Sequence, residues 1–114
     1  DVPDQTQKAT RLIESSTVYV TDVVIVEIMY VLEKVYELSR NDIHELVGDF
    51  LGFNNVVHNP NFLLDAIKSY KDHPSLSIVD CYASQEAKHY GNELITLDKR
   101  LVSQGEAHIR NLLQ

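Results

Sequence analysis

The sequence predicts one α/β domain with a parallel sheet flanked by helices in three layers. Short β-branched segments alternate with longer stretches whose apolar residues recur at helical spacing. The chain has 114 residues, which is enough for one hydrophobic core but not for two. No repeat or linker divides it, so we expect a single domain over residues 1–114.

The composition excludes several classes of protein. The single cysteine, Cys81, cannot form an internal disulfide framework and fits a reducing cytoplasm. No apolar run approaches the ~20 residues of a membrane span. The formal net charge of −7 argues against broad electrostatic binding to nucleic acid, which needs lysine and arginine. The surplus acids bind cations or solvate the surface, and composition leaves both possibilities open.

The first half of the chain supplies two expected strands. Residues 5–14 have a modest apolar face at helical spacing, and residues 17–20 are a β-branched and aromatic strand. Asp22 is the expected cap of a helix that runs to about Tyr36. Residues 39–42 are a capping box, and Gly52 ends the helix that follows it. Residues 55–58 form the second short strand.

The second half continues the alternation. Pro60 opens a helix, and residues 73–75 form a loop. A further helix spans residues 77–90, and residues 94–97 are the clearest strand in the chain. Residues 107–109 are a possible edge strand. A compact parallel sheet of this size is expected to have one strand more than the three or four visible here.

The most apolar stretch of the chain, residues 23–32, contains one carboxylate. Nine of its ten residues are apolar or aromatic, and the tenth is Glu27. A helix that is apolar on nearly every face is a buried helix. A buried carboxylate must be paired, protonated or coordinated. We therefore expect Glu27 to be buried against a partner.

Two more carboxylates lie in similar surroundings. Asp80 lies in the apolar segment 77–83, and Asp98 follows the strand 94–97 directly. Each acid has a structural alternative, because Asp80 fits a capping box, Asp98 fits an N-cap and Glu27 could pair with a buried base. Helices begin where parallel strands end, so we expect all three at the carboxyl edge of the sheet, where open α/β folds bind ligands.

Three carboxylates brought together need a counter-charge. Two unit charges ~4 Å apart repel by about 4 kcal/mol at an effective dielectric constant of about 20. No neighbouring lysine or arginine in the sequence serves all three acids. Hard divalent cations such as Mg²⁺ or Mn²⁺ take oxygen ligands and stabilise phosphoryl transition states. An acidic metal site is therefore the leading interpretation.

At these residues the chain resembles the PIN-domain family, and specifically the VapC-like toxins of prokaryotic toxin–antitoxin pairs. Residues 20–39 resemble the family's second acidic motif with its helix pair, residues 77–83 the third motif, and residues 94–101 the fourth. The order and spacing of the three motifs match together. The resemblance covers nearly the whole chain.

The resemblance implies a five-stranded parallel sheet between helices and metal-dependent hydrolysis of RNA phosphodiester bonds. Glu27, Asp80 and Asp98 would be catalytic metal ligands for Mg²⁺ or Mn²⁺, and Thr96 would support the site through its hydroxyl. It also implies an RNA substrate, a cognate antitoxin and a homodimer. From the composition we expect no membrane contact and a cytoplasmic location. The alternative is a non-catalytic PIN-like scaffold that acts through protein–protein contacts.

The chain departs from the family at its start. Family members begin with a central strand that ends in an aspartate, which is a metal ligand. Neither Asp1 nor Asp4 matches that residue, because no β-rich segment precedes them. We expect an N-terminally incomplete domain whose structure shows a gap, an exchanged strand or an unusual contact where the central strand belongs.

Basic residues are candidates for contacts with RNA, although solvated surface is the default interpretation of each. The candidates are Lys34, Arg40, Lys99 and Arg100.

Overall fold

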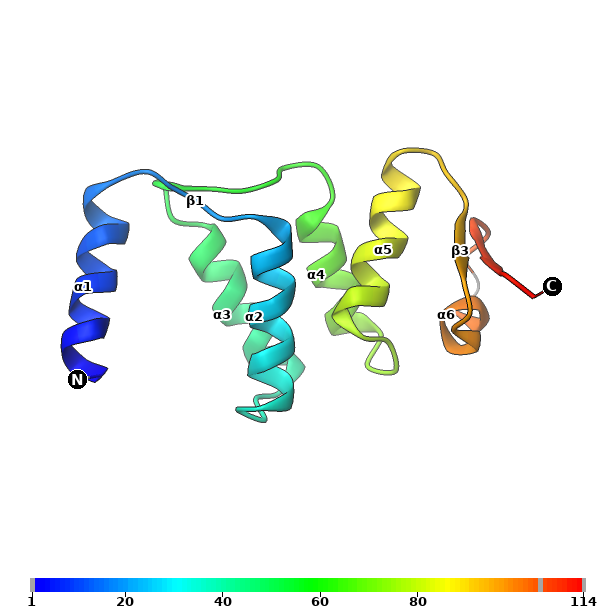
Figure 1. Cartoon of the computed structure of the whole chain (residues 1–114), viewed down its shortest axis with the longest axis horizontal. Coiled ribbons are helices and arrows are strands. Elements are labelled where there is room, and N and C mark those ends of the chain that lie inside the picture. Colours follow the sequence, from blue (N-terminus) through cyan, green and yellow to red (C-terminus); the bar gives the residue numbers. More distant parts are fainter. Residues whose placement is uncertain (1, 105, 114) are drawn as a thin grey trace.

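Helices alternate with short strands in the computed structural model, which describes residues 2–104 and 106–113 (Figure 1). The helices are α1 (Val2–Ser15), α2 (Asp22–Lys34), α3 (Arg40–Leu51), α4 (Leu63–Asp72), α5 (Ile78–His89) and α6 (Lys99–Ser103). The strands are β1 (Val18–Tyr19), β2 (Val56–Val57), β3 (Leu94–Thr96) and β4 (Ile109–Asn111). The alternation predicted from the sequence is confirmed.

Hydroxyl side chains begin three of the helices. Ser39 and Ser77 each accept a hydrogen bond from the backbone N–H three residues later, at 3.1 Å, and so cap α3 and α5 as predicted. At α2 the cap is Thr21, whose hydroxyl oxygen accepts from the N–H of Val24 at 3.3 Å. The prediction that Asp22 caps this helix is wrong, because Asp22 is already its first helical residue.

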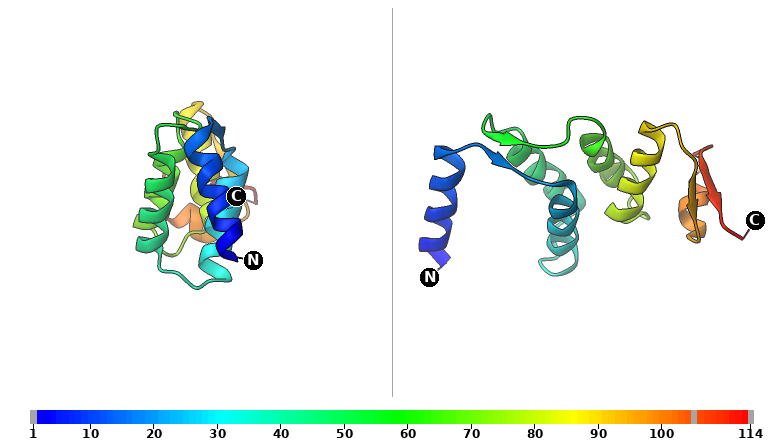
Figure 2. Two further views of the ribbon diagram at one scale, coloured as in Figure 1. Left: turned by 90° about the vertical axis from the view of Figure 1, so that its left-hand side faces the viewer. Right: turned by 45° about the horizontal axis from the view of Figure 1, so that its top comes forward.

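The strands form two separate parallel pairs. β1 pairs with β2, with Val18 opposite Val56, and β3 pairs with β4, with Leu94 opposite Ile109. No strand within the described residues joins the two pairs. Figures 1 and 2 show β1 toward one end of the molecule and β3 at the other, with α2, α4 and α5 between them. The expected gap in the sheet is confirmed.

In each pair both strands have one edge unpaired among the described residues, and the edges of β1 and β3 can be identified from the backbone hydrogen bonds. The N–H groups of Val18 and Val20 bond to carbonyls of the β2 segment at 2.8 and 3.0 Å, and that of Leu94 bonds to the β4 segment at 2.7 Å. Successive residues of a strand turn their peptide groups to opposite sides. Tyr19 in β1 and Ile95 in β3 therefore direct their peptide groups to the other edge of each pair.

The hydrophobic core lies among α2, α3, α4 and α5. Within it, α4 and α5 pack closely, and Tyr70 and Cys81 are fully buried. Burial raises the pKa of the free Cys81 thiol. Other core side chains come from all four helices: Ile25, Met29, Ile43, Val47, Leu63, Ile67 and Ile78. None of the described helices has the length and apolar character needed to cross a membrane.

A polar cluster at the edge of this core joins three helices. The Tyr70 hydroxyl donates to a Glu33 carboxylate oxygen at 2.6 Å. The Arg40 guanidinium lies over the Tyr70 ring, 4.0 Å from its centroid, and 3.4 Å from the Glu33 carboxylate. Arg40 also donates to the backbone carbonyls of Tyr70 and His73, at 2.7 and 3.2 Å. These contacts fix α2, α3 and α4 relative to one another.

The apolar stretch 23–32 is buried on one face only. Ile25 and Met29 enter the core, whereas Val23 is 75% exposed and Val24 and Ile28 are also exposed. The prediction that this helix is buried on nearly every face is wrong. Its outer face has no covering layer, because the sheet is divided and the described side chains of α1 are all exposed.

The overall shape is correspondingly open. The molecule measures 53 × 29 × 19 Å, and its radius of gyration is 16.0 Å. A compact domain of this length has a radius of gyration of about 13 Å. Figure 2 shows α1 standing apart from the helical core at one end.

Replacing Tyr70 by phenylalanine should lower the free energy of unfolding by about 2 kcal/mol at neutral pH, because the Glu33 carboxylate loses a hydrogen bond. Burial, and then the hydrogen bond to Glu33, raises the pKa of Tyr70 above its ordinary value of 10.0. Above about pH 10 the unfolded chain therefore loses the Tyr70 proton, whereas the native protein keeps it. The stabilisation is complete below about pH 10 and declines above it.

Urea unfolding of both proteins at neutral pH and above about pH 10 checks this expectation. The difference in stability between the Tyr70→Phe variant and the parent protein should narrow at the higher pH. A stability difference that is the same at both pH values would contradict the stabilising hydrogen bond from the Tyr70 hydroxyl to Glu33.

Candidate functional site

The structure places the three predicted acids on three different helices. Glu27 lies in the second turn of α2 and is exposed, so the prediction of a buried carboxylate is wrong there. Asp80 lies half-buried in the first turn of α5. Asp98 is the N-cap of α6, and its carboxylate accepts hydrogen bonds from the N–H groups of Arg100 and Leu101 at 2.9 and 3.4 Å.

Thr96 organises the turn that carries Asp98. Its hydroxyl oxygen accepts from the Asp98 N–H at 3.0 Å, which fixes the chain between β3 and α6. The Asp98 carboxylate also lies 3.7 Å from the Arg100 guanidinium. The capping alternative for Asp98 is therefore present in the structure, whereas at the start of α5 the cap is the Ser77 hydroxyl. Neither cap excludes a second role for the carboxylates.

A cleft of about 260 Å³ lies between the elements that carry these acids. Tyr30 and Lys34 of α2 line one side, the segment 74–78 that leads into α5 lines another, and Arg100 of α6 closes it. Glu27 lies on the same stripe of α2 as Tyr30 and Lys34, because residues three, four and seven apart share a helix face. Residues of α2, of α6 and of the segment leading into α5 therefore line one cleft, although Glu27, Asp80 and Asp98 are themselves outside its lining.

The acids do not form a metal site in this arrangement. Carboxylate oxygens are suitable ligands for a hard divalent cation. Yet no three His, Cys, Asp or Glu side chains in the described part of the chain lie together as a group that could hold a metal ion. The expected convergence at one sheet edge is not reached, because β1 and β3 belong to separate pairs. The assignment of Glu27, Asp80 and Asp98 as ligands stays a prediction.

Asp22, which was predicted only as a helix cap, makes hydrogen bonds to distant parts of the chain. One carboxylate oxygen accepts from the Tyr82 hydroxyl at 2.6 Å and from the Asn59 amide at 2.7 Å. Burial and this hydrogen bond raise the pKa of Tyr82. The other oxygen, Oδ1, is buried with no hydrogen-bond partner among the described residues. Such an atom carries a desolvation cost, so a donor is expected beside it.

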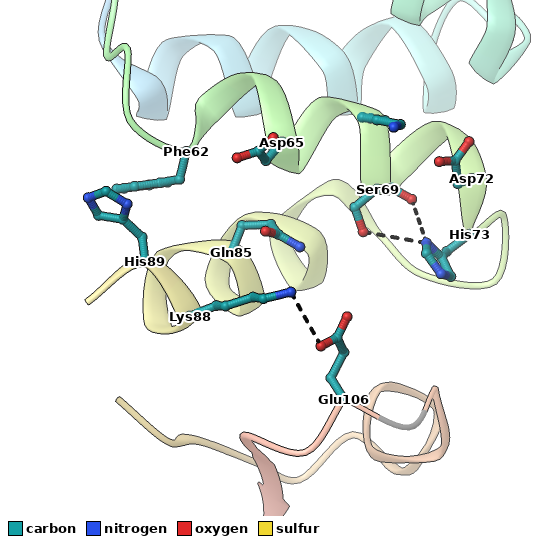
Figure 3. Close-up of a pocket in the computed structure, with 10 residues that line it drawn as sticks. Phe62, Asp65, Ser69, Asp72, His73, Gln85, Lys88, His89 and Glu106 are labelled. Atoms are coloured by element: carbon teal, nitrogen blue, oxygen red, sulfur yellow. Dashed lines mark hydrogen bonds and ion pairs between the residues drawn. The ribbon is translucent and has the colours of Figure 1, made fainter. Parts of the chain in front are cut away.

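A second, larger cleft of about 440 Å³ runs along α4 and α5 (Figure 3). Two pairs of its polar groups interact: His73 Nδ1 donates to the Ser69 carbonyl at 2.9 Å, and Lys88 lies 3.8 Å from the Glu106 carboxylate. It has no lining residue from α2 or α6. The smaller cleft is lined by α2, by the segment leading into α5 and by α6, which are the elements of the three acids, and we therefore take it as the candidate site.

Comparison with known proteins decides the family. The model of the PIN domain matches residues 3–106. The chain belongs to the PIN-domain family. The predicted family and its α/β fold are confirmed.

This PIN domain is also similar to a VapC ribonuclease of Aquifex aeolicus (strain VF5). The two are 34% identical over 90 residues, which cover 76% of this chain and 65% of that protein. The chain thus spans somewhat less than two thirds of that relative's length. No solved structure matches the chain.

The positions of the acids predict how much each substitution changes the free energy of unfolding of this PIN domain. Glu27 is exposed, so Glu27→Gln should change the free energy of unfolding by less than about 0.5 kcal/mol. Asp98→Ala removes an N-cap and should cost about 1 kcal/mol, whereas Asp98→Asn keeps the capping oxygen. Denaturant unfolding measures all three. A loss well above these values for Glu27→Gln would show that this carboxylate is structural.

Proposed function

We propose that this PIN domain is a metal-dependent endoribonuclease, and that it is the toxin of a toxin–antitoxin pair. The observation that carries the proposal is the set of three acids, which occur in the order and spacing of the family's motifs on elements surrounding one cleft. The similarity to a protein named VapC ribonuclease supports the same reaction. RNA is the proposed substrate.

A fifth parallel strand between β1 and β3 completes the proposed site. Two observations support such a strand: the edges of β1 and β3 at Tyr19 and Ile95 are unpaired, and Asp22 Oδ1 has no donor among the described residues. A strand bonded to both pairs would align the carboxyl ends of β1 and β3 at one edge. Glu27 and Asp98 would then approach each other from the two halves of the sheet.

In the completed sheet, Glu27, Asp80 and Asp98 are the proposed ligands of Mg²⁺ or Mn²⁺, and an aspartate at the end of the added strand is the fourth acid. Thr96 holds the Asp98 turn in place through its hydrogen bond to the backbone. Within the described residues the three acids are not grouped as ligands, so the proposed metal dependence rests on the family and on the carboxylate chemistry.

Protein partners are part of the same proposal. An apolar hollow of about 370 Å³ lies on the outer face of α2, next to Glu27. Its apolar lining is Val24, Ile28, Val31, Leu32 and Tyr36. Exposed apolar surface of this kind supports protein contacts, and the proposed partners are a cognate antitoxin and a second copy of the chain. The proposed location is the cytoplasm, in keeping with the single unpaired cysteine.

A non-catalytic PIN-like scaffold is the second candidate function. The specific observation in its favour is that the described carboxylates do not assemble into a metal-binding group. The scaffold and the nuclease differ in their response to added divalent metal.

A form of the protein that includes an additional N-terminal strand ending in aspartate should cleave single-stranded RNA with Mg²⁺ or Mn²⁺. In that form, Asp80→Asn should lower the cleavage rate about a hundredfold or more, because a charge that stabilises the reaction is lost. The matched control is Asp49→Asn, since Asp49 is an exposed acid on α3 away from the cleft. Gel assays of labelled RNA measure the rates.

The outcomes separate the two functions. RNA cleavage that is abolished by a chelator and lost in the Asp80→Asn variant supports the nuclease. Intact RNA, together with no metal binding by calorimetry, leaves the scaffold.

A further inference from the structure

The candidate cleft is lined by more cations than carboxylates, although the protein is acidic. The chain has a formal net charge of −7. The cleft nevertheless has three cations in its lining, Lys34, Arg40 and Arg100, against the single carboxylate of Glu33. Such local reversals of sign attract and orient anionic ligands, while the remaining surface repels them.

Two of these cations are not used by the fold. Arg40 is engaged with Glu33, with the Tyr70 ring and with two backbone carbonyls. Lys34 and Arg100, by contrast, are 60% and 72% exposed, and each is paired with one carboxylate at the long distance of 3.7 Å. Both groups keep donors for a phosphate oxygen.

An aromatic ring lies beside them. Tyr30 is 53% exposed and lines the same cleft, one turn before Lys34 on the same stripe of α2. Exposed aromatic faces next to cations are the combination by which proteins bind single-stranded nucleic acid, because bases stack on the ring while cations follow the backbone.

We propose that this cleft binds single-stranded RNA, with Lys34 and Arg100 contacting phosphates and Tyr30 stacking against a base. The proposal rests on the proposed function and adds to it the residues that position the substrate. Phosphate contacts fix the register of a strand without reading its sequence. Ile78, which precedes Asp80, and Arg100, which follows Asp98, line the cleft, so a strand bound there would lie beside the segments that carry these two acids.

Fluorescence anisotropy with a labelled oligouridylate, in the presence of chelator, tests binding without cleavage. The double variant Lys34→Ala/Arg100→Ala should weaken binding about tenfold and reduce the magnitude of the salt slope by about 1.4, because single strands contribute ~0.7 per phosphate contact. The matched control is Lys88→Ala/Arg110→Ala, which removes the same charges from side chains that are 58% and 59% exposed and paired with glutamates elsewhere. The control should bind like the parent protein.

A second pair of variants isolates the stacking contact without changing charge. Tyr30→Ala should weaken binding about fivefold or more, whereas Tyr30→Phe keeps the ring and should bind normally. Equal losses in the two double variants, no loss in either, or no RNA binding by the parent chain would overturn the proposal. RNA binding by the parent protein with selective loss in the cleft variants would support the proposed RNA-binding cleft. This result would stand even if the protein with the added strand failed to cleave RNA, because that failure would reject only the nuclease.

Discussion

A parallel strand directs alternate peptide groups to its two sides, and both sides must find partners for a sheet to be closed off from water. β1 and β3 each have a partner on one side only. The peptide groups of Tyr19 and Ile95 point to the side of each strand that faces away from its partner. This one unsatisfied constraint accounts for the open shape, the exposed outer face of α2 and the separation of the acids.

The helices hold the two strand pairs in one molecule although the sheet does not. The packing of α4 against α5 connects the β1–β2 half to the β3–β4 half. The contacts of Arg40 with Tyr70 and Glu33 set the positions of α2 and α3 on this core. Closure of the sheet therefore requires movement of the strand pairs relative to a helical core that is already formed.

The features that were predictable from sequence depend on local chemistry. The Ser39 and Ser77 caps follow from a hydroxyl three residues before an N–H group, and the alternation of strands and helices follows from the spacing of apolar residues. The gap was predictable by counting strands. The order of the acid motifs was sufficient to indicate the PIN family.

Other features depend on neighbours that the sequence does not specify. Glu27 was expected to be buried because residues 23–32 are so apolar, yet burial of that face requires a layer that is not in place. The hydrogen bonds from Asn59 and Tyr82 to Asp22 join residues distant in the chain, so no local pattern indicated them. The position of Asp22 directly after a strand was the only available signal.

The most direct test of the divided sheet is amide hydrogen exchange at the strand edges. In this chain the amides of Tyr19 and Ile95 should exchange nearly as fast as those of an unfolded peptide, whereas the amides of Val20 and Leu94, which are bonded within their pairs, should exchange more slowly. Equal protection at all four positions would show a continuous sheet and would contradict this account.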